Sequence, residues 1–183
     1  TTVHISSYVP VPILEIGSFL QDNDIDRVRK LFARESKDFL QKYFKKELFF
    51  TDVEGKTKDE VLKNLCRKVE QEKGLPETFT ASVLKREELT PTDYGNLVAL
   101  PHPERAFQER AFVAVAVLKE PIFWFRQKVQ VVFLTAIGRE EDENLQQFYE
   151  ATTDLILRPA DVQNLIRHPD YDRLIQLLRR AEE

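Results

Sequence analysis

The sequence predicts an α/β fold, in which a mixed β-sheet is flanked by helices on both faces. Segments with apolar residues at helical spacing alternate along the chain with shorter, almost wholly apolar runs. The clearest runs are residues 112–118 and 128–137. Such runs are typical of strands that are buried on both faces, because a strand with one solvent-facing side alternates polar and apolar residues. The sheet is therefore expected to lie between two layers of helices.

The first part of the chain, residues 1–46, is predicted to be the end of an upstream domain followed by a connecting helix. It holds a short β-type run at residues 11–16 and a helical stretch that starts near Asp22. One strand and one helix cannot bury a core of their own. Apolar positions within residues 39–48 predict a second amphipathic helix, which we interpret as a connector rather than a membrane-surface helix. The domain proper is expected to occupy residues 47–183.

Two helices are predicted to open this domain. Thr57 and Glu60 have the spacing of a capping box, and Gly74 is expected to end the helix that they start. The apolar face of this helix includes Cys66, which we interpret as a core residue rather than a reactive thiol. A second helix is predicted within residues 76–90.

Strands and then helices are predicted for the rest of the chain. Residues 95–102 form an apolar run that reads as a buried strand, followed by the two apolar runs named above. Trp124, in the segment that joins those two runs, is interpreted as part of an edge-packing cluster rather than a ligand stack. The acidic run at residues 140–143 is interpreted as the first turn of a helix rather than a metal site. Pro159 and Pro169 are each expected to open a further helix.

Composition limits the classes of function. The chain has 183 residues with a net charge of −4 and both signs interspersed, so we expect no direct contact of this piece with nucleic acid. No apolar run approaches the roughly 18–20 residues that a membrane span needs. The single cysteine and the lack of a leader pattern suggest a cytoplasmic protein. Because the sequence contains no methionine, we expect it to be a piece of a longer protein.

Several kinds of site find no support in the sequence. Its five glycines form no Gly-rich phosphate loop, and its three histidines and one cysteine show no zinc spacing. A Gly-x-Ser-x-Gly nucleophile elbow is missing as well. We therefore expect neither a metal nor a cofactor.

One constellation of residues remains, and it contains His102 and Arg86. His102 falls at the C-terminal tip of the strand predicted over residues 95–102, where α/β folds commonly place their chemistry. An imidazole with an ordinary pKa of about 6.5 keeps a nucleophilic nitrogen at cell pH. If the chain folds back after its second helix, Arg86 lies beside this tip, and a guanidinium can bind two phosphoryl oxygens. The spacing alone leaves open a structural histidine and a solvated arginine.

Residues 86–102 resemble the signature of the type 2 (mannitol/fructose) enzyme IIA domain of the bacterial sugar phosphotransferase system. That signature has an Arg-Glu pair, a Ser/Thr-Pro-Thr turn and then Gly-x-x-φ-Ala-φ-Pro-His, where φ is aliphatic. The conserved positions of its last part are matched by Gly95, Ala99, Pro101 and His102. The resemblance covers about residues 49–180 and implies an enzyme IIA (mannitol/fructose)-like fold. It also implies that His102 takes phosphate from the phosphocarrier protein HPr and that Arg86 stabilises the phosphohistidine.

The sequence departs from that family pattern at two positions. Pro103 follows the histidine where a small Gly or Ala is usual. Asn144 stands where transporter domains of the family often carry a second histidine, and an amide cannot carry the charge of an imidazolium. Asn144 therefore joins His102 and Arg86 as a candidate site residue, and onward transfer of the phosphate is less expected than its acceptance.

In both of these features the sequence resembles the enzyme IIA-like domain at the C-terminus of transcription regulators of the antiterminator and mannitol-activator kind. Such regulators place an enzyme IIB-like domain just before the IIA-like one, and residues 1–34 resemble the last strand and helix of such a domain. The resemblance thus implies a phosphorylatable regulatory domain whose partners are HPr and the neighbouring domains of the same polypeptide. One alternative is a transporter component that passes phosphate from His102 to a IIB domain. Another is a binding module that is not phosphorylated.

Overall fold

The structure is a computed structural model that describes residues 40–140 and 144–179, all of which belong to one compact unit of the chain. The strand and helix predicted before residue 40, together with the proposed IIB-like remnant, lie outside the described residues. The same holds for residues 141–143 of the acidic run. The domain boundary at residues 46 and 47 stays a prediction.

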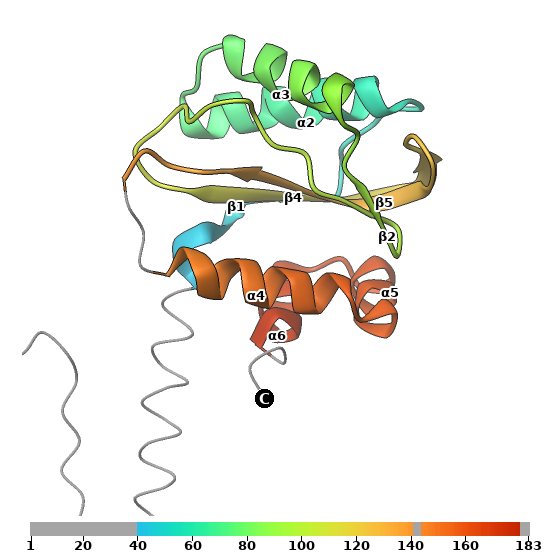
Figure 1. The fold of residues 1–183 in the computed structure, drawn as a ribbon. Helices are drawn as coiled ribbons and strands as arrows, with labels where there is room; N and C mark the ends of the chain where they lie inside the picture. The colour runs from blue at the N-terminus through green and yellow to red at the C-terminus, as the bar shows by residue number, and fades with distance from the viewer. Residues whose placement is uncertain (1–39, 141–143, 180–183) are drawn as a thin grey trace, which may run out of the picture. The chain divides into compact units, whose positions relative to one another are not determined.

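A five-stranded mixed sheet forms the centre of this unit (Figure 1). In spatial order its strands are β1 (Phe44–Phe50), β4 (Phe112–Phe123), β5 (Lys128–Ala136), β3 (Val98–Ala99) and β2 (Asp93–Gly95). The pairs β1–β4 and β3–β5 are parallel, whereas β4–β5 and β2–β3 are antiparallel. The predicted mixed sheet is therefore confirmed.

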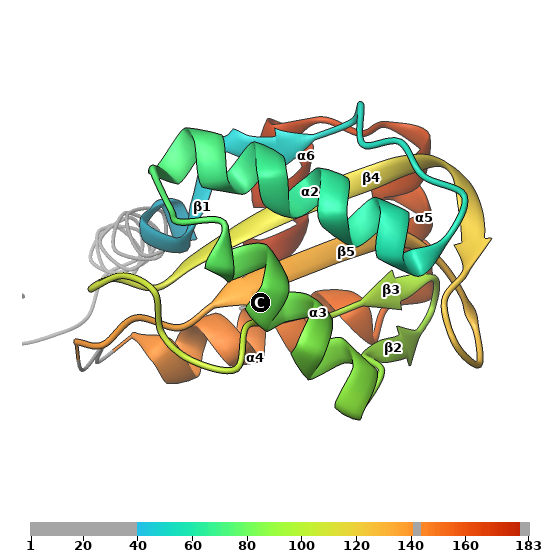
Figure 2. The ribbon, with the colours of Figure 1, turned by 90° about the horizontal axis from the view of Figure 1, so that it is seen from above.

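Helices cover both faces of the sheet, as Figures 1 and 2 show. On one face lie α2 (Lys58–Lys73) and α3 (Thr78–Leu89). On the other lie α4 (Leu145–Ile156), α5 (Pro159–Arg167) and α6 (Tyr171–Arg179). The predicted fold class is thus correct. Within the described part of the chain, no helix is long and apolar enough to cross a membrane.

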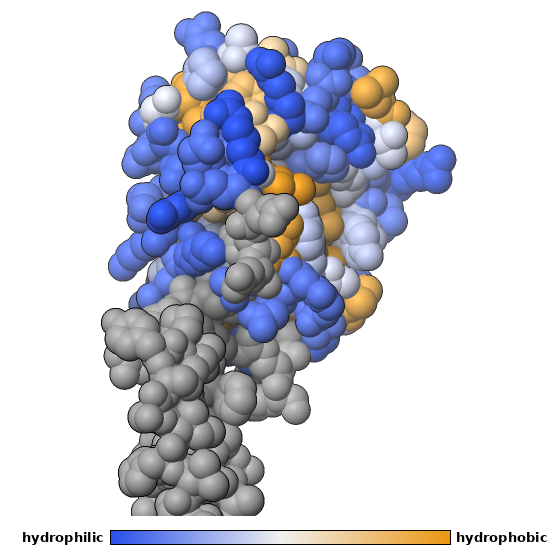
Figure 3. Space-filling model, turned by 60° about the vertical axis from the view of Figure 1, so that its left-hand side comes forward, coloured by the Kyte–Doolittle hydropathy of each residue, from blue (hydrophilic) through white to orange (hydrophobic). Residues whose placement is uncertain are grey.

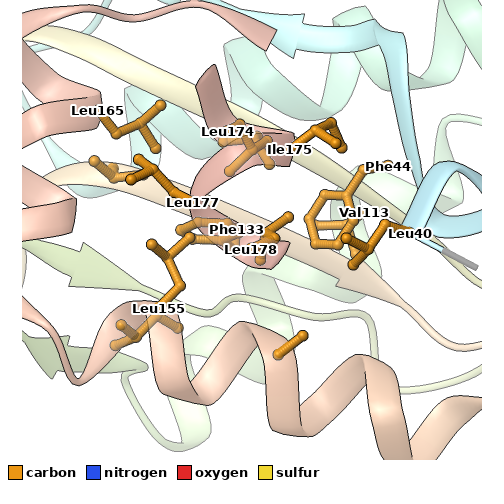
Figure 4. Close-up of a cluster of buried hydrophobic side chains, with 14 of the residues drawn as sticks. Leu40, Phe44, Val113, Phe133, Leu155, Leu165, Leu174, Ile175, Leu177 and Leu178 are labelled. Carbon is orange, nitrogen blue, oxygen red and sulfur yellow. The ribbon is translucent and has the colours of Figure 1, made fainter. Parts of the chain in front are cut away.

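The sheet separates two apolar clusters. Val113, Val115 and Val117 of β4 belong to the cluster beneath α4–α6, which Figure 4 shows in close-up. The alternate residues Ala114 and Ala116 belong to the cluster beneath α2 and α3. Successive side chains of a strand point to opposite faces, so a strand with a cluster on each side needs apolar residues throughout. On the face in Figure 3, hydrophilic residues form most of the surface and apolar residues appear between them in small groups.

Local signals in α2 act as the sequence predicts. Thr57 Oγ1 accepts a hydrogen bond from Glu60 N (3.3 Å), and Gly74 ends the helix with a left-handed φ of 63°. The Glu60 carboxylate reaches Lys56 N (2.8 Å) rather than the Thr57 amide. Cys66 is fully buried in the core, as predicted. Its burial raises the pKa of the thiol to about 12, so the reactive thiolate is not formed at neutral pH.

The helix predicted over residues 39–48 is wrong from Phe44 onward. Residues 40–43 are helical, and β1 begins at Phe44. Phe44 packs in the cluster beneath α4–α6, whereas Leu48 packs in the cluster beneath α2 and α3. A helix or a regular strand would place these two residues on the same side, since they are four positions apart. They lie on opposite sides of the sheet because the register of β1 with β4 shifts between Phe44 and Phe49. The apolar pattern of residues 39–48 is ambiguous between helix and strand, and pairing with β4 makes its second half a strand.

The strand predicted over residues 95–102 is also wrong, because a tight turn divides it. Asn96 and Leu97 have φ angles of 51° and 66°, which makes them the central residues of a two-residue hairpin turn between β2 and β3. Only Val98 and Ala99 then pair with β5. Gly-Asn is a turn signal that the apolar residues on its C-terminal side obscured.

Two smaller differences concern prolines. The segment predicted to join the two long strands belongs largely to β4, which continues past Pro121 to Phe123 across a shift in register. Proline is tolerated there because the ladder is already irregular. Pro159 opens α5 as predicted, whereas α6 begins after Pro169, where the Asp170 carboxylate accepts hydrogen bonds from the backbone amides that follow it.

Candidate functional site

His102 lines a pocket of about 360 Å³. Residues 91–94 form one wall, and one face of α4 from Phe148 to Ile156 forms another. Leu100 and Thr135 also line the pocket beside the histidine. The turn between β2 and β3 is tied to the end of α4, because Asn96 Nδ2 donates a hydrogen bond to Ile156 O (2.9 Å).

The imidazole of His102 is oriented by its own backbone segment. The side chain is half-buried, and its Nδ1 lies 3.3 Å from Leu100 O. A carbonyl oxygen can only accept a hydrogen bond, so this contact favours the tautomer that carries its hydrogen on Nδ1. In the neutral imidazole Nε2 then carries the lone pair. Pro101 O accepts from Thr135 N of β5 (3.0 Å), which fixes the segment just before the histidine to the sheet.

Helix α3 runs alongside the segment that follows His102. Ser82 Oγ accepts a hydrogen bond from Glu104 N (2.9 Å), and Lys85 forms an ion pair with the Glu104 carboxylate (3.0 Å). Ser82, Lys85 and Arg86 share one face of α3, because residues three and four positions apart are neighbours on a helix. The face that carries Arg86 is therefore the face next to the histidine segment.

Arg86 itself contacts the end of its own helix. The side chain is half-buried, and its Nη1 donates a hydrogen bond to Thr90 O (3.2 Å). Arg86 is not among the residues that line the pocket of His102. The structure thus brings the helix of Arg86 to the histidine segment, while the contact of the guanidinium with a phosphohistidine stays a prediction.

Asn144 stands at the start of α4. Its carbonyl oxygen accepts from the amide of Phe148 (3.0 Å), the first residue of α4 that lines the pocket. Asn144 lies one helical turn before that residue and does not line the pocket itself. Its part in the phosphate site stays a prediction.

The sequence pointed to the region of Glu87 and Thr92 without assigning either residue a role. Glu87 is buried, at 1% exposure, and both of its carboxylate oxygens accept hydrogen bonds. Oε1 accepts from Thr92 N (2.8 Å) and Trp124 Nε1 (2.7 Å), and Oε2 accepts from Thr92 Oγ1 (2.8 Å). Trp124 is therefore a packing residue, as predicted, but it is buried in the core and hydrogen-bonded to Glu87. The sequence signal that could have pointed to Glu87 and Thr92 was the Arg-Glu pair followed by Thr-Pro-Thr.

Aromatic side chains stand at the edges of the pocket. Tyr94 and Tyr149 line it from opposite walls and are 54% and 42% exposed. Partial burial raises the pKa of Tyr149, so its hydroxyl stays neutral at physiological pH. Asp93 fixes the wall that carries Tyr94, since its Oδ2 accepts from Arg126 N (2.7 Å) and Gln127 N (2.8 Å). Among residues 40–140 and 144–179, no group of three or more His, Cys, Asp or Glu side chains is arranged to hold a metal ion.

The fold is that of mannitol-type enzyme IIA domains. It matches a chain in the solved complex of enzyme IIAMTL with phosphorylated enzyme IIBMTL from Escherichia coli, with a TM-score of 0.61. The match is 18% identical in sequence and covers 74% of this chain and 97% of that one. This similarity concerns the fold alone.

The chain belongs to the family "Phosphoenolpyruvate-dependent sugar phosphotransferase system, EIIA 2", whose model matches residues 42–181. The family resemblance that the sequence suggested is thereby confirmed, and the match also includes β1. The chain is 34% identical over 174 residues to the probable licABCH operon regulator of Bacillus subtilis (strain 168). It is 27% identical over 120 residues to the transcriptional regulator ManR of the same organism.

The curated relatives are much longer than this chain. The match with the probable licABCH operon regulator covers 95% of this chain but 27% of that protein. The match with ManR covers 66% of this chain and 18% of the relative. The chain thus spans less than a third of the length of either of these two regulators.

Proposed function

We propose that this chain is a phosphorylatable regulatory domain of a sugar-responsive bacterial transcription regulator, and that it accepts a phosphoryl group from HPr on His102. The observation that carries the proposal is the contact between His102 Nδ1 and Leu100 O (3.3 Å), which leaves the Nε2 lone pair available beside the pocket. Membership of the enzyme IIA family and the similarity to two transcription regulators support the regulatory assignment.

The reaction is a transfer of one phosphoryl group between two proteins. Nε2 of His102 attacks phosphorus, a bond between Nε2 and phosphorus forms, and the bond between phosphorus and HPr breaks. The leaving group on HPr keeps the electron pair of the broken bond. Because Nδ1 donates its hydrogen to Leu100 O, the positive charge that develops on the imidazole is partly stabilised by the carbonyl dipole.

Arg86 is proposed to stabilise the phosphorylated state. Its guanidinium would leave Thr90 O and bind two oxygens of the new phosphoryl group, a geometry that arginine favours. The hydrogen bond of Ser82 to Glu104 supports this proposal, since it holds the Arg86 face of α3 next to the histidine segment. Asn144 would supply a neutral hydrogen-bond donor where a second histidine could supply a charge.

Phosphorylation would act on neighbouring domains through charge. A phosphohistidine adds about two negative charges beside the exposed rings of Tyr94 and Tyr149. A domain that contacts these rings would meet a more negative surface, and this change would bias the nucleic-acid-binding part of the regulator. The probable licABCH operon regulator extends far beyond the matched part, so such a protein has further domains that could respond.

A second candidate function is that of a transporter component. In this case His102 would pass its phosphate to a cysteine of a IIB domain. The observation that favours it is the match to a chain from the solved complex of enzyme IIAMTL with phosphorylated enzyme IIBMTL. Transfer of label from this chain to an added IIB domain would distinguish it from the regulatory assignment.

The direct test is phosphorylation by purified enzyme I, HPr and labelled phosphoenolpyruvate. We expect an acid-labile phosphate on the wild-type chain and none on His102→Ala. The matched control is His168→Ala, because this exposed histidine at the end of α5 should not affect labelling. Absence of label from the wild type, or its presence on His102→Ala, would contradict the proposal.

A further inference from the structure

A series of hydrogen bonds, joined through the backbone of Thr92 and Leu100, connects the buried carboxylate of Glu87 with the imidazole of His102. Thr92 N donates to Glu87 Oε1 (2.8 Å), and Leu100 N donates to Thr92 O (3.1 Å). Leu100 O then accepts from His102 Nδ1 (3.3 Å). The group that selects the tautomer of the histidine is thus held in place by Thr92, which is held in turn by Glu87.

Glu87 forms a fixed starting point for this series. It is 1% exposed, and its two oxygens accept three hydrogen bonds from Thr92 and Trp124. A buried carboxylate keeps its place only when its oxygens have partners, and loss of the carboxylate leaves the donors buried without acceptors. Replacement of Glu87 should therefore move Thr92 rather than leave it where it is.

The same residues form a wall of the pocket. Thr92 and Asp93 both line it, and Asp93 is itself held by the backbone amides of Arg126 and Gln127. Arg86 precedes Glu87 in the same turn of α3, so the inward-facing glutamate also fixes the part of the helix from which the arginine projects. The wall opposite α4 is in this way connected to the imidazole by defined polar contacts.

We propose that Glu87 is a positioning residue for the phosphoryl acceptor. By holding Thr92 it keeps the Leu100 carbonyl where that group accepts the Nδ1 hydrogen of His102, and so keeps Nε2 free and correctly oriented in the pocket. Groups that orient a reacting imidazole from behind commonly have large effects on rate. The consequence for transfer rests on the proposed function, whereas the consequence for the tautomer does not.

The chain contains a matched control for this glutamate. Glu70 of α2 accepts hydrogen bonds from Thr80 N (2.9 Å) and Thr80 Oγ1 (2.7 Å) through Oε1. It thus holds a threonine by the same two groups as Glu87 does. Thr80 lies near the start of α3, away from the series of hydrogen bonds that reaches His102. Glu70→Ala therefore removes a similar contact without affecting the histidine.

The first measurement is the tautomer of His102 in the unphosphorylated chain, obtained from its imidazole ¹⁵N chemical shifts at a pH where the ring is neutral. We expect the hydrogen on Nδ1 in the wild type and in Glu70→Ala, and a mixture of tautomers in Glu87→Ala. Glu87→Gln should restore the wild-type state, because one amide oxygen can accept from both Thr92 N and Trp124 Nε1. A wild-type tautomer in folded Glu87→Ala would overturn the proposal.

The second measurement is the steady-state rate of transfer from phosphorylated HPr. In Glu87→Ala we expect kcat to fall by about 10- to 100-fold with KM for HPr nearly unchanged, since the docking surface remains and only the acceptor is displaced. An equal fall in Glu70→Ala would overturn the proposal, because it would reveal a general effect on the fold. If the wild type accepts no phosphate, the proposed function fails while the tautomer measurement still tests the role of Glu87.

Circular dichroism and thermal unfolding must show that each variant is folded. Should Glu87→Ala not fold, Thr92→Val provides the same comparison, since it removes the hydroxyl bond to Glu87 and keeps the backbone. We then expect a smaller shift in tautomer and a fall in kcat of a few fold. A wild-type tautomer and a wild-type kcat in Thr92→Val would overturn the proposal.

Discussion

The two walls of the His102 pocket are held in different ways. Residues 91–94 are fixed by polar contacts of buried or half-buried side chains, above all those of Glu87 and Asp93. The α4 wall is fixed mainly by apolar packing, with Phe148 and Leu155 in the cluster beneath α4–α6. Hydrogen bonds are directional and therefore fix the orientation of the groups that they join, whereas apolar contacts stabilise burial without fixing an orientation. We infer that the first wall orients the imidazole and the second offers a surface to partners.

This comparison predicts the largest loss of stability on the α4 side. Phe148 is 1% exposed, and its ring lies 4.8 Å from that of Tyr43 and 5.9 Å from that of Phe44, between centroids. Phe148→Ala should lower the free energy of unfolding by about 3–5 kcal/mol, measured by urea denaturation, because it leaves a cavity. A loss below about 1 kcal/mol would mean that apolar packing does not hold this wall.

Arg86 should affect chemistry without affecting stability. Arg86→Ala is expected to lower the rate of phosphoryl transfer to His102 by about 100-fold, because a charge-stabilising donor is lost. The control is Lys85→Ala, which removes the same charge from the neighbouring position and breaks only an exposed ion pair with Glu104. Equal rates for the two variants would show that Arg86 contributes net charge rather than a specific contact.

Tyr149 should affect binding of the phosphate donor more than the chemical step. Tyr149→Ala is expected to raise KM for HPr by about 10-fold with little change in kcat, because an exposed ring at the pocket edge is lost. Leu157→Ala is the control, since Leu157 is 58% exposed at the end of the same helix and does not line the pocket. A fall in kcat alone would contradict the assignment of this wall to partner binding.

The smallest effect is expected at Asn144. Asn144→His should increase transfer of phosphate from this chain to a IIB domain by a few fold, because an imidazolium can stabilise the phosphoryl group in transit. Asn144→Gln, which keeps the amide, should leave this transfer unchanged. If both variants transfer phosphate as slowly as the wild type, the residue at this position does not decide between acceptance and onward transfer.

Features of the sequence that depend on neighbouring residues were predictable. The N-cap at Thr57, the stop at Gly74 and the opening of α5 at Pro159 are local signals, and the structure has all three. The continuous apolar runs of β4 and β5 likewise predicted a sheet between two helical layers. The position of His102 followed from a long family signature rather than from periodicity.

Features that depend on distant partners were not predictable. Glu87 and Trp124 are 37 residues apart, so nothing in the local sequence shows that this glutamate is buried. The strand β1 was mistaken for a helix because its pairing with β4 is a contact across more than 60 residues. The turn at Asn96 and Leu97 was missed for a different reason: a leucine rarely takes a positive φ, so the apolar run appeared unbroken.

The nitrogen of His102 that carries the phosphoryl group tests the central claim most directly. The chain would be labelled with ¹⁵N, phosphorylated through enzyme I and HPr, and examined by ³¹P and ¹⁵N NMR. Because Nδ1 is held by the Leu100 carbonyl, we predict a phosphorus–nitrogen coupling at Nε2 and a hydrogen retained on Nδ1. Phosphorus on Nδ1, or on any residue other than His102, would contradict the account of how this pocket presents its histidine.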